Sequence, residues 1–320
     1  MVWVGLLAVA TSAVGGCVSA RGRVSDGVPN EGETIGLANL IDPEPDIPSR
    51  DLLLGVGGRR WQPPDSPFRL AREDPEGASR KLEVIDRNGM AWNVKFGEEA
   101  RPEVTASRLL WAVGYHQSPE YYVPRWVLEG GSTAGVQEGA RFRPELAWRV
   151  IGHWEWRHNP FVGSRELRAL VVFMGLINNW DLKASQNVIL ERPGLTPRRI
   201  WIVGDLGAAF GGSGWLTHSK DDLPDFAGEP LVRGTEGDHV DLALRVGYAR
   251  EWGLDEDIEI DDVVWLCQRL ERLTEQQWRD AFRAGGYSER ESAAFVAELK
   301  RKVQEGLRLA EREPEAPTGE

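Results

Sequence analysis

The stretch Asn178–Asn187 has the sequence NNWDLKASQN, and the stretch Ile202–Gly207, which follows shortly after it, has the sequence IVGDLG. Asp181 is an acid able to take a proton from an attacking hydroxyl, and a Lys lies two residues beyond it. Asn187 carries an amide that can ligate a metal ion, and Asp205 supplies a carboxylate directly before a Leu-Gly pair. Together these residues indicate phosphoryl-transfer chemistry, which needs charge neutralisation and alignment more than covalent catalysis.

The segments around these two stretches predict a helix, a loop and a hairpin. From about Ser164 to Ile177, apolar residues recur on one face at helical spacing. Residues 187–191 and 199–203 predict two short strands joined by a turn at Pro193-Gly194. The loop between helix and hairpin therefore carries Asp181 and Lys183, and the second strand leads directly to Asp205.

An earlier segment predicts a second hairpin followed by a helix. Residues 81–96 alternate apolar and polar around Asn88-Gly89, a pair that predicts a tight turn because both residues tolerate positive φ. Lys95 lies between two apolar residues, so its side chain should point to the opposite face of the strand. Residues 102–114 then predict a helix, opened by Pro and ended by Gly, with Glu103 in its first turn.

Composition bounds the class of protein. The chain has 320 residues, of which 41% are hydrophobic, enough for a sizeable core in one large or two-lobed domain. Its net charge of -12 and the lack of a basic stripe argue against a nucleic-acid partner. The 14 Trp residues favour an aromatic core, to which we assign the Trp154–Trp156 segment. Cys267 lies in a helical pattern and is expected to be a small core hydrophobe.

The amino-terminal residues predict export and attachment to a membrane. Residues 1–17 contain a short apolar stretch that ends at Val14-Gly15-Gly16-Cys17, and this resembles a signal peptide with a bacterial lipobox. Lipidation of Cys17 would make the protein an extracytoplasmic, membrane-tethered lipoprotein; a single membrane anchor or a plain cleaved signal are the alternatives. Residues 18–50 predict a flexible tether, and residues 311–320 a disordered tail.

The ordered set of residues resembles the protein-kinase-like superfamily, and more closely its atypical bacterial branches, the HipA-like and CotH-like kinases. The resemblance implies an α+β, two-lobed fold, with a small antiparallel β-rich N-lobe at residues 51–130 and a larger, mainly helical C-lobe at residues 131–310. It implies that ATP and Mg²⁺ are the cofactors.

The resemblance also assigns a role to each residue. Asp181 and Lys183 match the catalytic loop; Lys95 and Glu103 match the lysine that holds phosphates and the glutamate that orients it, a role that Glu98 or Glu99 could also take. Asn187 and Asp205 match the metal ligands. A standard glycine-rich loop is absent, but Gly77 to Ser79 could curve over phosphates through backbone N–H groups, so the cofactor-binding set also includes Gly77 and Ser79.

Two departures from the family pattern affect the expected function. Asn187 follows Asp181 by six positions (187 − 181), one more than in the usual catalytic loop. Asn179-Trp180 replaces the usual His-Arg before the aspartate, which removes the anchor for a phosphorylated activation loop. The resemblance implies a phosphotransferase that acts on a hydroxyl of an unidentified protein or small molecule. A pseudokinase or nucleotide-binding scaffold, and a nucleotidyltransferase with the same fold, are the alternatives.

Overall fold

A computed structural model describes residues 34–74, 80–214, 218–245 and 253–311. The predicted export signal, the lipobox at Cys17, and both Gly77 and Ser79 lie outside these ranges. Helices and strands both contribute substantially, which confirms the predicted α+β class. In the described part of the chain, no helix combines the length and apolar character needed to span a membrane.

The first part of the fold is a closed five-stranded barrel with the strand order β1-β2-β3-β5-β4. Its strands are β1 (Phe68–Asp74), β2 (Lys81–Ile85), β3 (Ala91–Phe96), β4 (Tyr121–Glu129) and β5 (Gly135–Pro144). Neighbouring strands are antiparallel except for a short parallel contact between β1 and β4. The barrel extends to residue 144, so the predicted lobe boundary after residue 130 falls inside the β4–β5 hairpin.

Aromatic residues fill the barrel interior. Phe68, Trp126 and Phe142 lie with ring centroids 5.0–5.8 Å apart. On β3, Trp92 and Val94 point into this interior and are at most 2% exposed. The strand alternation therefore places Lys95, the residue after Val94, on the outer face of the barrel.

The β2–β3 hairpin has a longer turn than the sequence predicts. Ile85 pairs with Ala91, which leaves residues 86–90 as the connection. Of the Asn88-Gly89 pair, Gly89 alone takes a positive φ, of 83°. The Asp86 carboxylate accepts hydrogen bonds from the backbone N–H groups of Asn88 and Met90, at 2.8 and 3.0 Å, and so fixes the wider turn.

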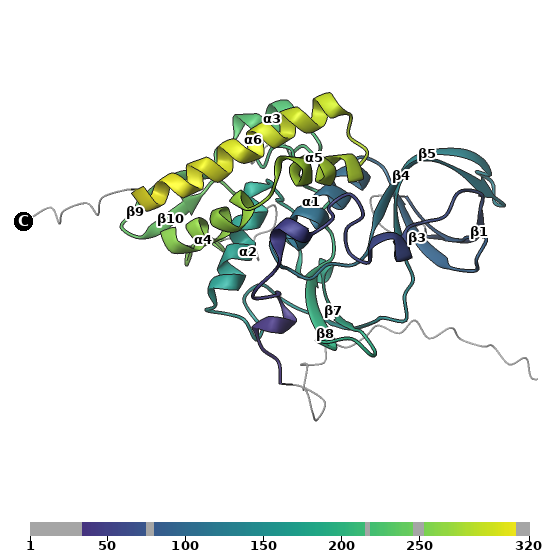
Figure 1. Ribbon diagram of the computed structural model, residues 1–320, viewed down its shortest axis with the longest axis horizontal. Helices are drawn as coiled ribbons and strands as arrows, with labels where there is room; N and C mark the ends of the chain where they lie inside the picture. The colour runs from purple at the N-terminus through teal and green to yellow at the C-terminus, as the bar shows by residue number, and fades with distance from the viewer. Residues whose placement is uncertain (1–33, 75–79, 215–217, 246–252, 312–320) are drawn as a thin grey trace, which may run out of the picture.

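Helix α1 (Ala100–Ala112) lies between the barrel and the remaining, mainly helical part (Figure 1). That part contains α2 (Arg165–Leu176), α3 (Leu223–Gly228), α4 (Ile260–Glu271), α5 (Glu275–Ala284) and α6 (Glu289–Leu307). It also contains the sheet β6 (Arg149–His153), β7 (Asn187–Glu191) and β8 (Arg199–Val203), and the hairpin β9 (Val232–Glu236) and β10 (His239–Leu242). The predicted helices and strands near the two motifs are thus confirmed, to within two residues at their ends.

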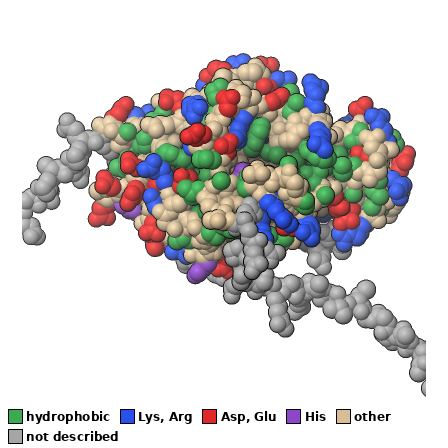
Figure 2. All heavy atoms as spheres, turned by 60° about the horizontal axis from the view of Figure 1, so that its bottom comes forward, with side chains coloured by type: hydrophobic (Ala, Val, Ile, Leu, Met, Phe, Trp, Pro, Cys, Tyr) green, Lys and Arg blue, Asp and Glu red, His purple; other side chains and the backbone are tan. Residues whose placement is uncertain are grey.

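A continuous hydrophobic core joins α1 to the helical part. Trp154, Trp156 and Cys267 are buried in it, as the sequence predicts. Acidic and basic side chains are both spread over the surface of the face shown in Figure 2.

Residues 34–50 are packed against this core, which corrects the predicted tether over its second half. Leu40, Ile41 and Ile47 are at most 1% exposed. The backbone N–H of Asp42 donates to the carbonyl of Gly114 at 3.0 Å, and the Gln277 side chain donates to the carbonyl of Ile47 at 2.7 Å. A few well-spaced apolar residues suffice to bury a segment that lacks any helical or strand period.

Lys302 on α6 supports the loop that follows α2. Asn178 ends α2 in the left-handed conformation, with φ 52°, which an Asn tolerates better than most residues. Its side-chain oxygen accepts a 2.7 Å hydrogen bond from Lys302, and its amide donates to the carbonyl of Gly211 at 2.8 Å. Lys302 is fully buried beneath the ring of Phe226, and this burial lowers the pKa of its amine to about 7.

The lowered pKa of Lys302 predicts a pH dependence of stability. Between about pH 7 and the pKa of an unfolded lysine, near 10.4, the unfolded chain binds a proton that the folded chain lacks, so this residue makes stability rise with pH. Relative to Lys302→Met, the wild-type free energy of unfolding should increase from pH 7 to pH 9 by up to about 1.4 kcal/mol per pH unit. Denaturant unfolding at several pH values measures this difference, and parallel curves for the two proteins would contradict it.

Candidate functional site

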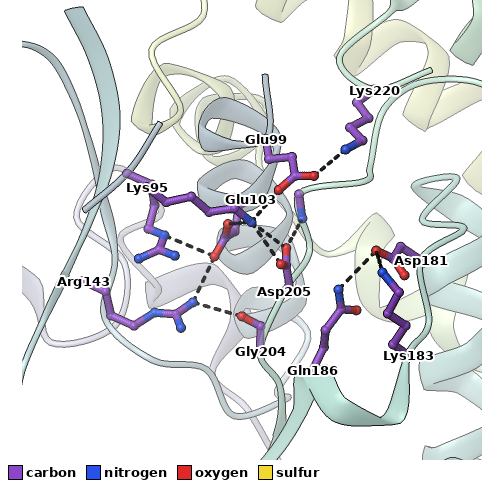
Figure 3. Close-up of polar contacts among 12 residues, drawn as sticks. Lys95, Glu99, Glu103, Arg143, Asp181, Lys183, Gln186, Gly204, Asp205 and Lys220 are labelled. Carbon is purple, nitrogen blue, oxygen red and sulfur yellow. Dashed lines mark hydrogen bonds and ion pairs between the residues drawn. The ribbon is translucent and has the colours of Figure 1, made fainter. Parts of the chain in front are cut away.

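Lys95 is the centre of the site. The alternation of side chains along β3 places Lys95 on the outer face of the barrel, where it is only 2% exposed. Its ammonium donates to Glu103 at 3.0 Å and to both carboxylate oxygens of Asp205 at 3.0 Å, and it lies 2.7 Å from Glu99 (Figure 3). Burial opposes the charge, but the three carboxylates outweigh it and raise the pKa of Lys95 above its usual value.

Helix α1 supplies two of these carboxylates. Glu99 precedes its first residue and Glu103 follows one turn later, so both face the same strand. The sequence left the partner of Lys95 open among three glutamates; the structure brings Glu99 and Glu103 to it, whereas Glu98 is exposed. Glu103 is the more deeply placed, with a side chain only 1% exposed.

Two arginines on β5 complete the charge network beside Lys95. Arg141 lies 3.2 Å from a Glu103 oxygen, and Arg143 donates to Glu103 at 3.0 Å and to Glu120 at 2.8 Å. Arg143 also donates to the carbonyl of Gly204 at 3.0 Å, which joins the barrel to the residue before Asp205.

The network is balanced in charge. Lys220, beyond the Asp205 loop, pairs with Glu99 from the side opposite Lys95 (Figure 3). The basic groups are Lys95, Arg141, Arg143 and Lys220, and the acidic groups are Glu99, Glu103, Glu120 and Asp205, so the formal charges sum to 4 − 4 = 0. Buried charges are tolerated when each is paired in this way.

Glycines allow Asp205 to reach Lys95. Asp205 follows β8, and its Oδ1 accepts a 3.1 Å hydrogen bond from the N–H of Gly207. A Cβ on Gly204 would lie 2.5 Å from the carbonyl oxygen of Gln186, and one on Gly207 would lie 2.6 Å from the Cβ of Glu99. Desolvation opposes the charge on Asp205, but Lys95 and the Gly207 N–H lower the pKa of its carboxyl below the usual value.

Asp181 lies in the loop after α2, near but outside this network. Its Oδ2 accepts hydrogen bonds from Lys183 at 3.1 Å and from the Gln186 amide at 3.2 Å (Figure 3). Its Oδ1 is buried and has no hydrogen-bond partner among the described residues. The indole of Trp156 donates to the carbonyl of Leu182 at 2.9 Å and so holds the loop in place.

The predicted catalytic loop has one extra residue, and the amide side chain that reaches the cavity is therefore that of Gln186 and not that of Asn187. The side chain of Asn187 is 1% exposed and is not among those that line the cavity described below. Asn187 pairs with Val203 in the β7–β8 ladder, and Val203 faces the hydrophobic core. Gln186, which lies five positions after Asp181 (186 − 181), does line the cavity and contacts Asp181.

A cavity of about 560 Å³ lies between the barrel and the β6-β7-β8 sheet. One part is polar and is lined by Lys95, Glu103, Gln186 and Asp205, among others. The other part is apolar, with walls that include Trp148, Val150, Val188, Leu190 and Ile202. This combination of an apolar region and a few convergent polar groups is typical of small-molecule sites.

The side chains of the polar region could hold a divalent cation whose remaining coordination positions are filled by phosphate oxygens and water. The described residues contain no group of three or more His, Cys, Asp or Glu side chains placed to hold a metal ion. Mg²⁺, however, needs only one or two protein oxygens when phosphate oxygens and water complete its shell. Asp205 and Gln186 can supply a carboxylate and an amide oxygen from the wall of one cavity.

Four residues of the site were not predicted from the sequence: Glu120, Arg141, Arg143 and Gln186. A signal was present for the two arginines, because Arg141 and Arg143 flank Phe142 with the period of a strand. The usual five-position spacing from Asp181 was the signal for Gln186.

Removing the Glu103 charge should destabilise the fold. Glu103→Gln leaves Lys95, Arg141 and Arg143 short of one buried carboxylate, and we expect a loss of roughly 3–5 kcal/mol in the free energy of unfolding. Glu83→Gln is the matched control, because Glu83 lies in the same barrel and pairs with the largely exposed Arg72; it should change stability by less than about 1 kcal/mol. Chemical denaturation compares the variants, and equal effects would contradict the importance of this network.

No protein-family model matches the chain, and no curated protein matches its sequence. Among solved structures, the chain is similar to the proinflammatory kinase CtkA of Helicobacter pylori, with a TM-score of 0.47 and 10% sequence identity. The alignment covers 78% of this chain and 99% of that protein.

Proposed function

We propose that the protein is an ATP- and Mg²⁺-dependent phosphotransferase of the atypical kinase type, which transfers a phosphoryl group to a hydroxyl acceptor. The observation that carries the proposal is the position of Lys95, whose ammonium contacts both Glu103 on the helix that follows its strand and Asp205 from a distant hairpin. A buried lysine paired with a helix glutamate, close to an aspartate that can bind the metal ion and in the wall of a cavity, is the arrangement that protein kinases use for phosphoryl transfer from ATP.

The cavity has regions suited to the two ends of a nucleotide. The apolar walls, with Trp148, Val188 and Ile202, would hold the base, and the region around Lys95 would receive the phosphates. Asp205 and Gln186 would hold the Mg²⁺ ion, so Gln186 replaces Asn187 in the proposed ligand set. When bound, the ion neutralises charge on the phosphate oxygens.

Asp181 is the proposed base. Its Oδ2 is held by Lys183 and Gln186, which fixes the carboxylate, while its Oδ1 has no hydrogen-bond partner within the described part of the chain. That second oxygen is buried in the unliganded protein, so an acceptor hydroxyl would have to displace the packing around it in order to donate its hydrogen bond and pass its proton to Asp181 as the phosphoryl group is transferred. Lys183, already beside the carboxylate, would offset the negative charge that gathers there.

A nucleotide-binding scaffold is the second candidate, and the position of Asn187 favours it. The side chain that the kinase pattern assigns to the metal is buried and does not line the cavity, so metal binding depends on Gln186 taking its place. The two functions share the nucleotide site and differ in whether the Asp181 loop is active.

Thermal unfolding with nucleotides tests the binding site. A ligand that binds only the folded protein raises its stability, so ATP with Mg²⁺ should raise the melting temperature. Asp205→Asn should abolish the part of the shift that depends on Mg²⁺ and leave a shift by adenosine. The absence of any shift with ATP, GTP or adenosine would contradict a nucleotide site.

Phosphotransfer tests the role of Asp181. With radiolabelled ATP and the intact protein, a generic acceptor or the protein itself should gain label. Asp181→Asn should reduce this rate by about 10²–10⁴-fold, while the ATP-induced rise in melting temperature is retained. ATP binding without transfer in the wild type would favour the scaffold, and mass spectrometry of a labelled product would separate an added phosphate from the AMP that a nucleotidyltransferase adds.

A further inference from the structure

A row of basic residues crosses the barrel face that forms one wall of the cavity. Lys81 on β2 is the direct cross-strand partner of Lys95 on β3, and Lys95 is the partner of Arg141 on β5. Residues directly opposite each other on neighbouring strands point to the same face, with Cβ atoms about 4.5–5.5 Å apart. All three side chains line the cavity, which confirms that they share this face.

Lys81 differs from the other two in its partners. Lys95 and Arg141 each lie against two or more carboxylates within the balanced network. Across the described residues, Lys81 has neither an ion pair nor a side-chain hydrogen bond. It is partly exposed at the start of β2.

Because the charge network around Lys95 is neutral overall, binding of a polyphosphate requires a further positive charge. Each basic group in it already faces a carboxylate, so an incoming anion finds no net positive charge there. A triphosphate chain carries several negative charges, and a single divalent cation does not neutralise them all. Lys81 is the cation in this wall that can add a charge to the ligand without leaving a protein carboxylate unpaired.

We propose that Lys81 is a second phosphate-binding lysine, which acts with Lys95 to hold the polyphosphate chain of a nucleoside triphosphate. This inference rests on the proposed nucleotide site and assigns the preference for the triphosphate to a residue on β2. In this arrangement phosphate oxygens lie between the Lys81 and Lys95 ammonium groups. Lys81 would therefore contact the phosphates and make no contact with the base.

The test compares the binding of ATP and of adenosine to the full chain. Isothermal titration calorimetry or thermal unfolding measures the binding. Lys81→Gln should weaken ATP binding in the presence of Mg²⁺ by about tenfold, the low end for a lost hydrogen bond between charged groups at a partly exposed position. Adenosine binding should change by less than about twofold. The melting temperature of the unliganded variant should stay close to that of the wild type, because Lys81 has no ion pair or side-chain hydrogen bond to lose among the described residues.

Two further variants serve as controls. Lys81→Arg keeps the charge and should bind ATP within about threefold of the wild type. Arg125→Gln removes an exposed cation on β4 that lies 3.9 Å from Glu138 and outside the cavity, and it should leave ATP binding unchanged. An equal loss of ATP and adenosine binding in Lys81→Gln would overturn the inference, because it would mean damage to the barrel.

The outcomes separate this inference from the function on which it rests. If the wild type and Lys81→Gln bind ATP equally well, the proposed role of Lys81 is wrong, but the proposed nucleotide site is still supported. If the wild type binds neither ATP nor adenosine, the proposed function fails and the inference fails with it.

Discussion

The ion pairs of Lys95 hold together three parts of the fold that are far apart in the sequence. One ammonium group, buried on the outside of the barrel, contacts carboxylates from the start of α1 and from the loop after β8. Each contact compensates part of the cost of burying the others, since none of these charges would be stable alone in a dry environment. The barrel, α1 and the β7–β8 hairpin therefore take up mutual positions that also define the cavity.

The arginines of β5 extend this constraint toward the β8 loop. Arg143 contacts both Glu103 and the carbonyl of Gly204, so a single side chain links the lysine partner to the residue before Asp205. A network this dense favours one arrangement, because a shift of α1 would leave several charges unpaired together. The segment after Asp205 adds Lys220 to Glu99 and thereby ties α1 to the helical part as well.

Local patterns in the sequence predicted the helices and strands around the two motifs, whereas β1, β5 and β6 were not predicted. The period of Leu167 to Ile177 and the alternation around Lys95 each reflect one buried face, and both elements formed as predicted. The segment at residues 34–50 was missed because it is buried by irregular chain with no period to detect. Gln186 ends the 3-10 turn before β7, whereas Asn187 is the first residue of β7 and pairs with Val203, so the exchange depends on where the strand begins and not on the residue type.

The hydrogen bond between Lys302 and Asn178 links a residue near the end of the described chain to the loop that carries Asp181. The two residues are 124 positions apart, and the one that gives support comes later in the chain. During synthesis the loop of Asp181 emerges from the ribosome long before α6, and until α6 is made, Asn178 at the end of α2 lacks its buried partner Lys302. A chain interrupted before α6 would therefore carry the residues of both motifs without the hydrogen bond from Lys302 that supports the loop after α2.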